Sequence, residues 1–421
     1  MPDGHVIVVG GGPAGLVAAR HLAEGGLTVD LFEASDDVGG RVRSRSHRGY
    51  TLDRGFQALQ TGFPAVQREL DLDDLDLRRI DPGAVICRPG SRSTVADPFQ
   101  DPGALLETLT NRELTTGDKL RLLRLRRELR ARSWGSIFAG SDRSTLEALL
   151  DRGFSDGFVD AFARPFYGGI TLDRSLETSS RVFEAVTKAL LSGPSAVPAD
   201  GMGAVTRQLA RRAETAGATI HTGSSVETVS SDGERATAQV RGSEHAADAV
   251  VVATDARTAR SLTGIESIPT RHHSCATQYY SLPEESAPDG RRIHLNATDE
   301  GPSHCLTLSN VVPEYADGDR ALLSVTTLDD LEASDAKLDD RTRRALGSWY
   351  PERHFGDLEL LATDRIEFGQ FAQPPGSHDD LPDATAPRGP CYLAGEYTRW
   401  SSVAGAFDSG RTTAQRVLAD H

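Results

Sequence analysis

The sequence predicts an α/β protein in which a Rossmann-like domain, built from discontinuous segments, carries a second, α+β domain. Three neighbouring features near the N-terminus support the first part. The β-branched run 6–9 is typical of a parallel strand buried on both faces. The turn 10–15 fits the pattern G-x-G-x-x-G, and residues 16–23 continue with apolar positions at helical spacing. Strand, glycine turn and helix in this order favour dinucleotide binding.

The glycines of this turn have separate expected roles. Gly10 permits the tight turn, Gly12 lets a pyrophosphate approach the backbone, and Gly15 lets the helix pack close to the sheet. A second strand is expected over 28–32, directly before Glu33. An acidic side chain at this distance from the glycines accepts hydrogen bonds from the two ribose hydroxyls of an adenosine. The N-terminal segment therefore predicts a site for an ADP moiety.

The next segment adds a pair of glycines and a cation. Gly39 and Gly40 permit close backbone approach, and the guanidinium of Arg41 can neutralise a pyrophosphate with two hydrogen bonds. The stretch VIVVGGGPAGLVAARHLAEGGLTVDLFEASDDVGGRVRS resembles the N-terminal signature of the flavin-dependent amine oxidase superfamily, which includes phytoene desaturases and protoporphyrinogen oxidases. The resemblance implies that the dinucleotide is FAD.

Two later segments extend the resemblance into the middle of the chain. Residues 53–57 resemble the family segment beneath the isoalloxazine ring, although an ordinary turn after a strand is the alternative. Residues 197–203, with the helix 204–216 that follows, resemble the family segment that leads to a strand whose backbone, here at Val226, pairs with the adenine edge. Asp200 departs from the family pattern because it replaces the first glycine of a Gly-Gly pair.

The end of the chain resembles the family's last flavin segment. A short strand over 391–394 ends in Gly395-Glu396, which in the family holds the ribityl and pyrophosphate region. Gly405 and Ala406 open the last helix, whose N-terminus would face the flavin N1/O2 edge and stabilise the anionic reduced form. The implied FAD contacts are Gly10, Gly12, Pro13, Ala14, Gly15, Glu33, Ala34, Gly39, Gly40, Arg41, Gly55, Phe56, Gln57, Val226, Gly395, Glu396, Gly405 and Ala406.

These placements predict how the chain is divided. The FAD-binding domain would comprise residues 1–75, 195–260 and 385–421, and the substrate domain would comprise 76–194, which is mostly helical, and 261–384. No second G-x-G-x-x-G follows a strand, so we expect no NAD(P)H domain. Reduced flavin would then pass its electrons to oxygen or a quinone, unless the reaction is redox-neutral.

The four cysteines lie far apart, without a C-x-x-C pair or a histidine at metal-ligand spacing, so no metal site is expected. Only Cys391 lies near the last flavin segment, which predicts noncovalent FAD. No nucleophile elbow supports a hydrolase.

The residues expected on the substrate side bear on which reaction the protein catalyses. Amine oxidases of this family commonly carry a strand lysine near the flavin N5 and an aromatic cage. Here the three lysines (Lys119, Lys188 and Lys337) lie in helix-like segments, and Ser402 stands at the expected cage position. The sequence therefore favours a desaturase-like dehydrogenase, with hydride passing from a small or lipophilic substrate to flavin N5. An amine oxidase that forms an imine and hydrogen peroxide, a redox-neutral isomerase and a non-catalytic FAD-binding protein remain alternatives.

No catalytic residue can be assigned. The segment 164–169 is expected to interrupt the helices with a rigid aromatic turn, whose aromatic residues either line the substrate channel or pack the core. The aromatic residues at 397 and 400 either form a wall of the site or pack the strand-to-helix turn. The substrate-side candidates are Phe56, Gln57, Phe166, Tyr167, Tyr397 and Trp400.

The net charge of the chain limits the kinds of partner that it can bind. The net charge of −15 argues against nucleic acid. Only three of the 46 basic residues are lysine, a composition that resembles proteins of halophilic archaea, although a GC-rich genome gives the same bias. The N-terminal apolar stretch is too short for a signal peptide, so a cytoplasmic location is expected.

A basic amphipathic helix is expected over 119–132, where basic residues alternate with leucines. It predicts peripheral docking on anionic lipid, and the alternative is that it pairs with the protein's own acidic surface.

Overall fold

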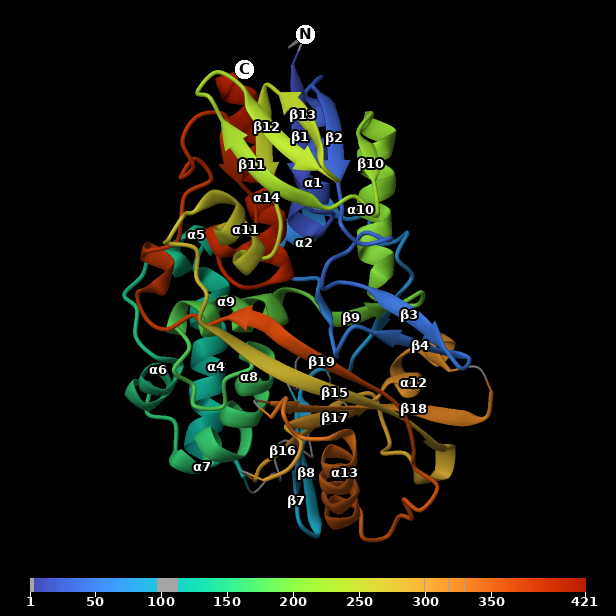
Figure 1. Cartoon of the computed structure of the whole chain (residues 1–421). Helices are drawn as coiled ribbons and strands as arrows, with labels where there is room; N and C mark the ends of the chain where they lie inside the picture. The colour runs from blue at the N-terminus through green and yellow to red at the C-terminus, as the bar shows by residue number, and fades with distance from the viewer. Residues whose placement is uncertain (1–3, 97–112, 299, 317, 329) are drawn as a thin grey trace.

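The computed structural model describes residues 4–96, 113–298, 300–316, 318–328 and 330–421. Its first sheet contains five strands, and every neighbouring pair is parallel. Their order is β10 (Thr219–His221), β2 (Thr28–Phe32), β1 (His5–Val9), β14 (Ala249–Val252) and β20 (Cys391–Leu393). The strands come from distant parts of the chain, yet they lie side by side at the top of Figure 1, near both termini. This arrangement confirms the predicted α/β fold built from discontinuous segments.

The two faces of this sheet are covered differently. Val6 and Val8 of β1 belong to one hydrophobic cluster, and Ile7 and Val9 belong to another, as alternation along a strand requires. The first cluster includes residues of α1 (Pro13–Glu24), α10 (Gly203–Ala216) and α14 (Val403–Asp420). The second includes residues of β11 (Val226–Ser231), β12 (Ala236–Val240), β13 (Ser243–Ala247) and α11 (Ala256–Thr263). Burial on both faces explains why this strand is continuously apolar.

The second sheet has seven strands, and all neighbours except β16 and β7 are antiparallel. Their order is β19 (Glu359–Phe371), β15 (His272–Pro283), β18 (Arg320–Leu328), β17 (His304–Thr307), β16 (Ile293–Asn296), β7 (Ala84–Arg88) and β8 (Ser91–Val95). Helix α13 (Asp335–Trp349) covers one face through Leu346 and Trp349. Strands β7 and β8 thus join a sheet formed mainly by residues 272–371. The boundaries proposed for the two domains remain a prediction.

A group of helices stands beside this sheet (Figure 1). It contains α4 (Thr116–Ala131), α5 (Trp134–Phe138), α6 (Thr145–Asp151), α7 (Asp156–Phe158), a π-helical turn (Val159–Ala163), α8 (Arg164–Thr171) and α9 (Ser180–Ser192). The prediction of a rigid turn over 164–169 is wrong, because these residues form α8. Pro165 starts the helix instead of breaking it, since its missing N–H is not needed in the first turn. Gly168 is required there because a side chain would reach within 2.8 Å of the Arg174 backbone.

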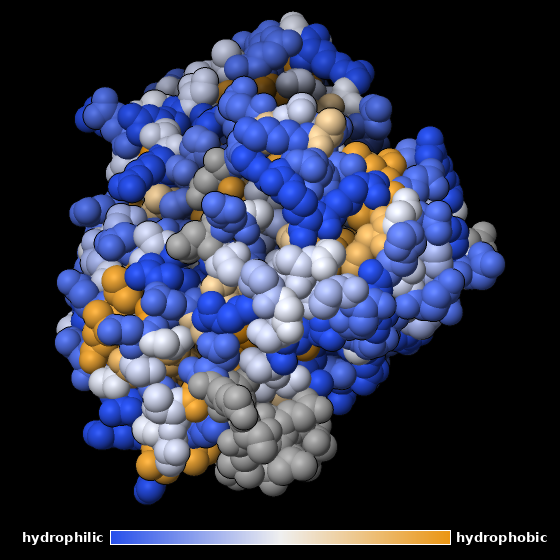
Figure 2. All heavy atoms as spheres, turned by 90° about the horizontal axis from the view of Figure 1, so that it is seen from below, coloured by the Kyte–Doolittle hydropathy of each residue, from blue (hydrophilic) through white to orange (hydrophobic). Residues whose placement is uncertain are grey.

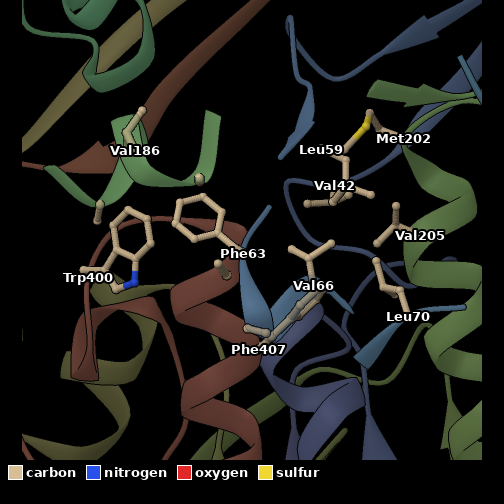
Figure 3. Packing of buried hydrophobic residues seen from close by; sticks show 14 of the residues in the cluster. Val42, Leu59, Phe63, Val66, Leu70, Val186, Met202, Val205, Trp400 and Phe407 are labelled. Carbon is tan, nitrogen blue, oxygen red and sulfur yellow. The ribbon is translucent and has the colours of Figure 1, made fainter. Parts of the chain in front are cut away.

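Short elements link the sheets: β3 (Ser44–His47), β4 (Tyr50–Asp53), β5 (Leu59–Gln60), β6 (Leu77–Arg79), β9 (Ser195–Pro198), α2 (Pro64–Glu69) and α12 (Leu308–Val311). The core continues through them. Phe63 lies between Trp400 and Val66, and Phe407 of α14 packs below them (Figure 3). In the part of the chain that the structure describes, no helix is long and apolar enough to span a bilayer.

Candidate functional site

A cavity of about 630 Å³ lies between the predicted flavin segments and the second sheet. One end is bordered by residues of the predicted flavin segments: Pro13, Arg41, Gly55, Phe56, Gln57, Glu396 and Ala406. The other end is bordered by side chains of the second sheet and of helices α4, α8 and α9. Segments that are hundreds of residues apart therefore meet at one site.

The glycine turn leaves the space that a pyrophosphate needs. A Cβ built at Gly12 meets nothing within 4 Å, so this face of the turn is open. A Cβ at Gly15 would collide with the carbonyl oxygen of Gly10, which explains why the first turn of α1 requires glycine at this position. The backbone N–H of Gly39 donates to the carbonyl oxygen of Gly11 at 2.8 Å, so the second glycine segment lies against the first. The open face lies at the N-terminus of α1, whose dipole favours an anion.

Glu33 is held beside this turn with its carboxylate already oriented. It is only 9% exposed, and it accepts hydrogen bonds from the backbone N–H groups of Gly11 (2.7 Å) and Ser35 (2.8 Å). Ala34 follows at the surface. The backbone N–H of Ser224 donates to the carbonyl oxygen of Glu33, which brings the segment leading to Val226 next to this carboxylate. The predicted ribose and adenine contacts are thus neighbours in space.

Arg41 lies at the flavin end of the cavity. Its guanidinium donates to the Gly369 carbonyl oxygen at 2.8 Å and to Glu396 Oε1 at 2.6 Å. Gln57, which was expected to face the flavin, donates its side-chain amide to the carbonyl oxygens of Arg41 and Arg54. Its role is therefore to fix the loop beside the cavity.

The last flavin segment is shaped by two close approaches. A Cβ at Gly395 would collide with the ring of Tyr397, and one at Gly405 would collide with the carbonyl oxygen of Trp400. Ser402, which stands where a cage aromatic was expected, caps α14 by accepting a hydrogen bond from the Gly405 N–H at 2.7 Å. This requirement for a cap explains the serine.

The departure at Asp200 has a simple explanation. Its side chain is exposed, whereas Gly201 has a φ of 85° and a Cβ there would press into Ser44. Only the second glycine of the family's pair is needed in this chain.

The aromatic candidates divide into two groups. Phe166 and Tyr167 border the cavity: Phe166 stacks on Phe162 at 5.0 Å, and the Tyr167 hydroxyl lies 3.0 Å from Thr187 Oγ1. Burial raises the pKa of Tyr167 to about 12, so its hydroxyl stays protonated.

Tyr397 and Trp400 are not among the residues that border the cavity. Tyr397 is buried against the first sheet and donates to the carbonyl oxygen of Val252 at 3.2 Å. Trp400 packs on Phe63, with ring centroids 5.2 Å apart (Figure 3). It also packs on Phe138, at 5.8 Å. The structure places both in the core, where they pack the strand-to-helix turn.

None of the three lysines lies on a strand. Lys119 of α4 borders the far part of the cavity, and Lys337 lies on α13. Lys188 of α9 is buried and donates to the carbonyl oxygen of Leu129 at 2.8 Å, and desolvation lowers its pKa. The strands beside the predicted flavin segments instead contribute Cys275, Ile366 and Gln370 to the cavity.

Two polar cavity residues were not predicted. Ser401 Oγ and both ring nitrogens of His304 are buried and have no hydrogen-bond partner among the described residues. A lone serine or histidine in an apolar segment carries no sequence signal that would have revealed this. Of the four cysteines, only Cys275 borders the cavity, and Cys391 is buried in the cluster on the opposite side of the first sheet.

Comparison with known proteins agrees with this geometry. The chain is 29% identical to phytoene dehydrogenase of Streptomyces griseus over 326 residues, which cover 68% of this chain and 62% of that enzyme. It is 31% identical to protoporphyrinogen oxidase 2 of Arabidopsis thaliana over 39% of this chain and 32% of that enzyme. The chain thus covers less than two thirds of the length of either relative.

A solved structure described as a putative protoporphyrinogen oxidase from Exiguobacterium sp. 255-15 superimposes with a TM-score of 0.74, at 18% identity, over 100% of both chains. At that identity the likeness shows the fold. The sequence profile described as "Flavin containing amine oxidoreductase" matches residues 13–418. The chain therefore belongs to the family of flavin-containing amine oxidoreductases, and FAD is its cofactor.

Proposed function

We propose that this protein is an FAD-dependent dehydrogenase of the desaturase type that removes hydride from a lipophilic organic substrate. The observation that carries the proposal is the apolar lining of the cavity beyond the flavin segments, which comprises Leu122, Leu125, Phe162, Phe166, Leu190, Leu191, Ile293, Leu295 and Ile366. Apolar walls bind a substrate by burying its surface and exclude water from the reaction. When bound, FAD supplies the hydride acceptor at N5.

The residues of the flavin end have supporting roles. Arg41 offers positive charge where the pyrophosphate is expected, and Gln57 keeps the loop 53–57 in place beside the ring site. The N-terminus of α14 is directed at the same region and favours negative charge on the reduced ring.

The site gives less support to an amine oxidase. A protonated amine needs a carboxylate or an aromatic cage. The carboxylate of Glu396 borders the cavity but is paired with Arg41. The aromatic residues expected to form a cage, Tyr397 and Trp400, pack in the core. No lysine occupies a strand beside the flavin segments. A redox-neutral isomerase remains compatible with the same walls.

Access from a lipid surface would suit such a substrate. Helix α4 borders the cavity through Leu122 and Leu125, while Leu120 (63% exposed) and Leu123 (44% exposed) face solvent. The surface seen from below is mostly hydrophilic and carries hydrophobic residues on both its left and right sides (Figure 2). We infer that α4 docks on anionic lipid at the cavity entrance.

We also infer that oxygen or a quinone reoxidises the flavin, that the protein works in the cytoplasm, and that it comes from a salt-rich habitat. The habitat follows from the net charge of −15 and from basic residues that are nearly all arginine.

Anaerobic mixing tests the dehydrogenase directly. The FAD-loaded protein, prepared in high salt, is mixed in a stopped-flow spectrometer with a conjugated polyene, with a porphyrinogen and with putrescine. We expect the visible flavin band to bleach with a lipophilic substrate and to persist with putrescine. Bleaching with the amine alone would overturn the proposal. Conversion of substrate without bleaching would establish an isomerase instead.

A further inference from the structure

His304 is an unusual side chain in the cavity wall. It lies on β17, in the middle of the second sheet, and is only 3% exposed. Neither ring nitrogen has a hydrogen-bond partner among the described residues. Burying polar atoms without partners costs free energy, so such groups in native proteins are normally satisfied by something.

A neighbouring histidine shows what a structural role looks like in this sheet. His294 of β16 is equally buried, and its Nδ1 is hydrogen bonded to the hydroxyl of Tyr350. It faces the cluster under α13, where Cys305 also packs. His304 precedes Cys305 and therefore points to the opposite face of the sheet, into the cavity.

Both apolar and polar groups surround His304. On β18 its cross-strand partner is Thr326, whose hydroxyl is hydrogen bonded to that of Thr277. The ring of Phe56 meets the imidazole edge-on, with centroids 5.4 Å apart, and Leu295 is its cross-strand partner on β16. Gly169 of α8 faces it from the helical side, where a Cβ would lie 3.2 Å from Nδ1. Any side chain at position 169 would therefore press on this nitrogen.

The imidazole is neutral at physiological pH. Burial, followed by the nearby positive charge of Arg174, lowers the pKa of His304 to about 4. One ring nitrogen then donates a hydrogen bond and the other accepts one. Such a ring pairs with an uncharged hydroxyl or carbonyl group, whereas an ammonium group would be repelled by Arg174 and poorly solvated by these walls.

We propose that His304 is a specificity-determining residue, which hydrogen bonds to an uncharged hydroxyl or carbonyl oxygen of an otherwise apolar substrate. The inference rests on the proposed function in taking this cavity as the substrate site. It narrows the substrate class to oxygen-bearing lipophilic molecules, in preference to plain hydrocarbons. His304 lies between Phe56, at the flavin end of the cavity, and Gly169 of α8, where the apolar substrate walls begin.

A matched pair of probes tests the proposal by binding alone. Naphthalene and 2-naphthol differ by one hydroxyl, and both are titrated into the FAD-loaded protein while the visible flavin spectrum or the heat is recorded. Wild type should bind 2-naphthol about tenfold more tightly, because naphthalene leaves the imidazole unpaired. In His304→Leu this preference should vanish, while the naphthalene affinity changes little.

Two further variants keep the test decisive. His304→Asn retains a donor and an acceptor and should restore part of the preference, which guards against a folding defect in the leucine variant. His294→Leu removes a histidine from the other face of the same sheet and should leave the preference unchanged. Equal binding of both probes by wild type, or a preference that persists in His304→Leu, would overturn the proposal. So would loss of FAD in the leucine variant, because His304 would then serve the flavin.

The outcome is separable from that of the proposed function. If the probe preference depends on His304 but no lipophilic compound bleaches the flavin, the dehydrogenase assignment fails while the recognition site stands. If plain hydrocarbons bleach the flavin equally well in wild type and His304→Leu, the dehydrogenase stands and the recognition site fails.

Discussion

The guanidinium of Arg41 donates a hydrogen bond to the carboxylate of Glu396, with Nη2 and Oε1 2.6 Å apart although the residues are separated by 355 positions. Glu396 is almost fully buried, whereas Arg41 is about one-third exposed toward the cavity. The pair joins the N-terminal glycine segment to the turn after β20. The guanidinium also offsets the negative charge of this carboxylate, which would otherwise lie uncompensated near the predicted pyrophosphate site.

Replacing Arg41 should therefore damage both stability and cofactor binding. Arg41→Gln leaves the Glu396 carboxylate buried without its cation, and we expect a loss of about 2 kcal/mol in the free energy of unfolding, discounted for the exposure of the arginine. Urea unfolding of the FAD-free protein measures this. The double variant Arg41→Gln/Glu396→Gln should recover most of the stability but not the FAD affinity. Equal stability of Arg41→Gln and wild type would show that the pair is not coupled.

Glu33 provides the second prediction. Glu33→Ala removes the acceptor expected for the ribose hydroxyls and also frees the N–H groups of Gly11 and Ser35. FAD affinity should fall by about 1 to 3 kcal/mol, the cost of leaving buried polar groups unpaired. Flavin occupancy after dialysis, followed by absorbance, measures the loss. Full occupancy in the variant would refute the assignment of the ADP site.

FAD should be released by acid. Cys391 faces away from the cavity, and burial raises its pKa, so its thiol is a poor nucleophile. Precipitation with trichloroacetic acid should leave all flavin in the supernatant. Yellow colour in the pellet would indicate a covalent link, and Cys275, the one cysteine that borders the cavity, would then be replaced by serine to locate it.

Local signals account for the parts of the fold that the sequence predicted. The apolar run of β1, the glycine turn and α1 are each encoded within a few residues, and so is α10. The parallel pairing of β7 with β16 joins residues about 200 positions apart, and nothing in either strand indicates its partner. The segment 164–169 was misread because Pro165 and two glycines usually interrupt helices. Here the proline starts one and the glycines admit Arg174 and His304.

The sequence likewise predicted some residues of the candidate site correctly and others not. Arg41 and Glu396 were proposed for the same region from separate segments, and the structure brings them together. Tyr397 and Trp400 were candidates because aromatic residues near a flavin segment suggest a cage. In the structure Tyr397 packs closely on Gly395 and the Trp400 backbone lies close to Gly405, and both side chains point into the core. His304 could not be distinguished from His294 in sequence, because both lie in apolar strands. The structure separates them by the face of the sheet to which each points and by the presence or absence of a hydrogen-bond partner.

The last prediction concerns the basic helix α4. Part of its charge is used internally: Arg132 pairs with Glu184, and Arg130 donates to the carbonyl oxygen of Leu191. Arg124 and Arg127, by contrast, are exposed and form no ion pair with the described residues. They share the outer face of the helix with Leu120 and Leu123, because positions three, four and seven apart coincide on a helix.

This face should bind vesicles that contain anionic lipid. Wild type should co-sediment with phosphatidylglycerol vesicles and not with phosphatidylcholine vesicles, and binding should weaken with salt. Arg124→Gln/Arg127→Gln should reduce the bound fraction severalfold, since each basic residue near the surface contributes about 1 kcal/mol. The matched control Arg211→Gln/Arg416→Gln removes the same charge from α10 and α14 and should sediment like wild type. If wild type stays in solution at every salt concentration, or if both double variants lose binding equally, α4 is not a lipid-docking surface.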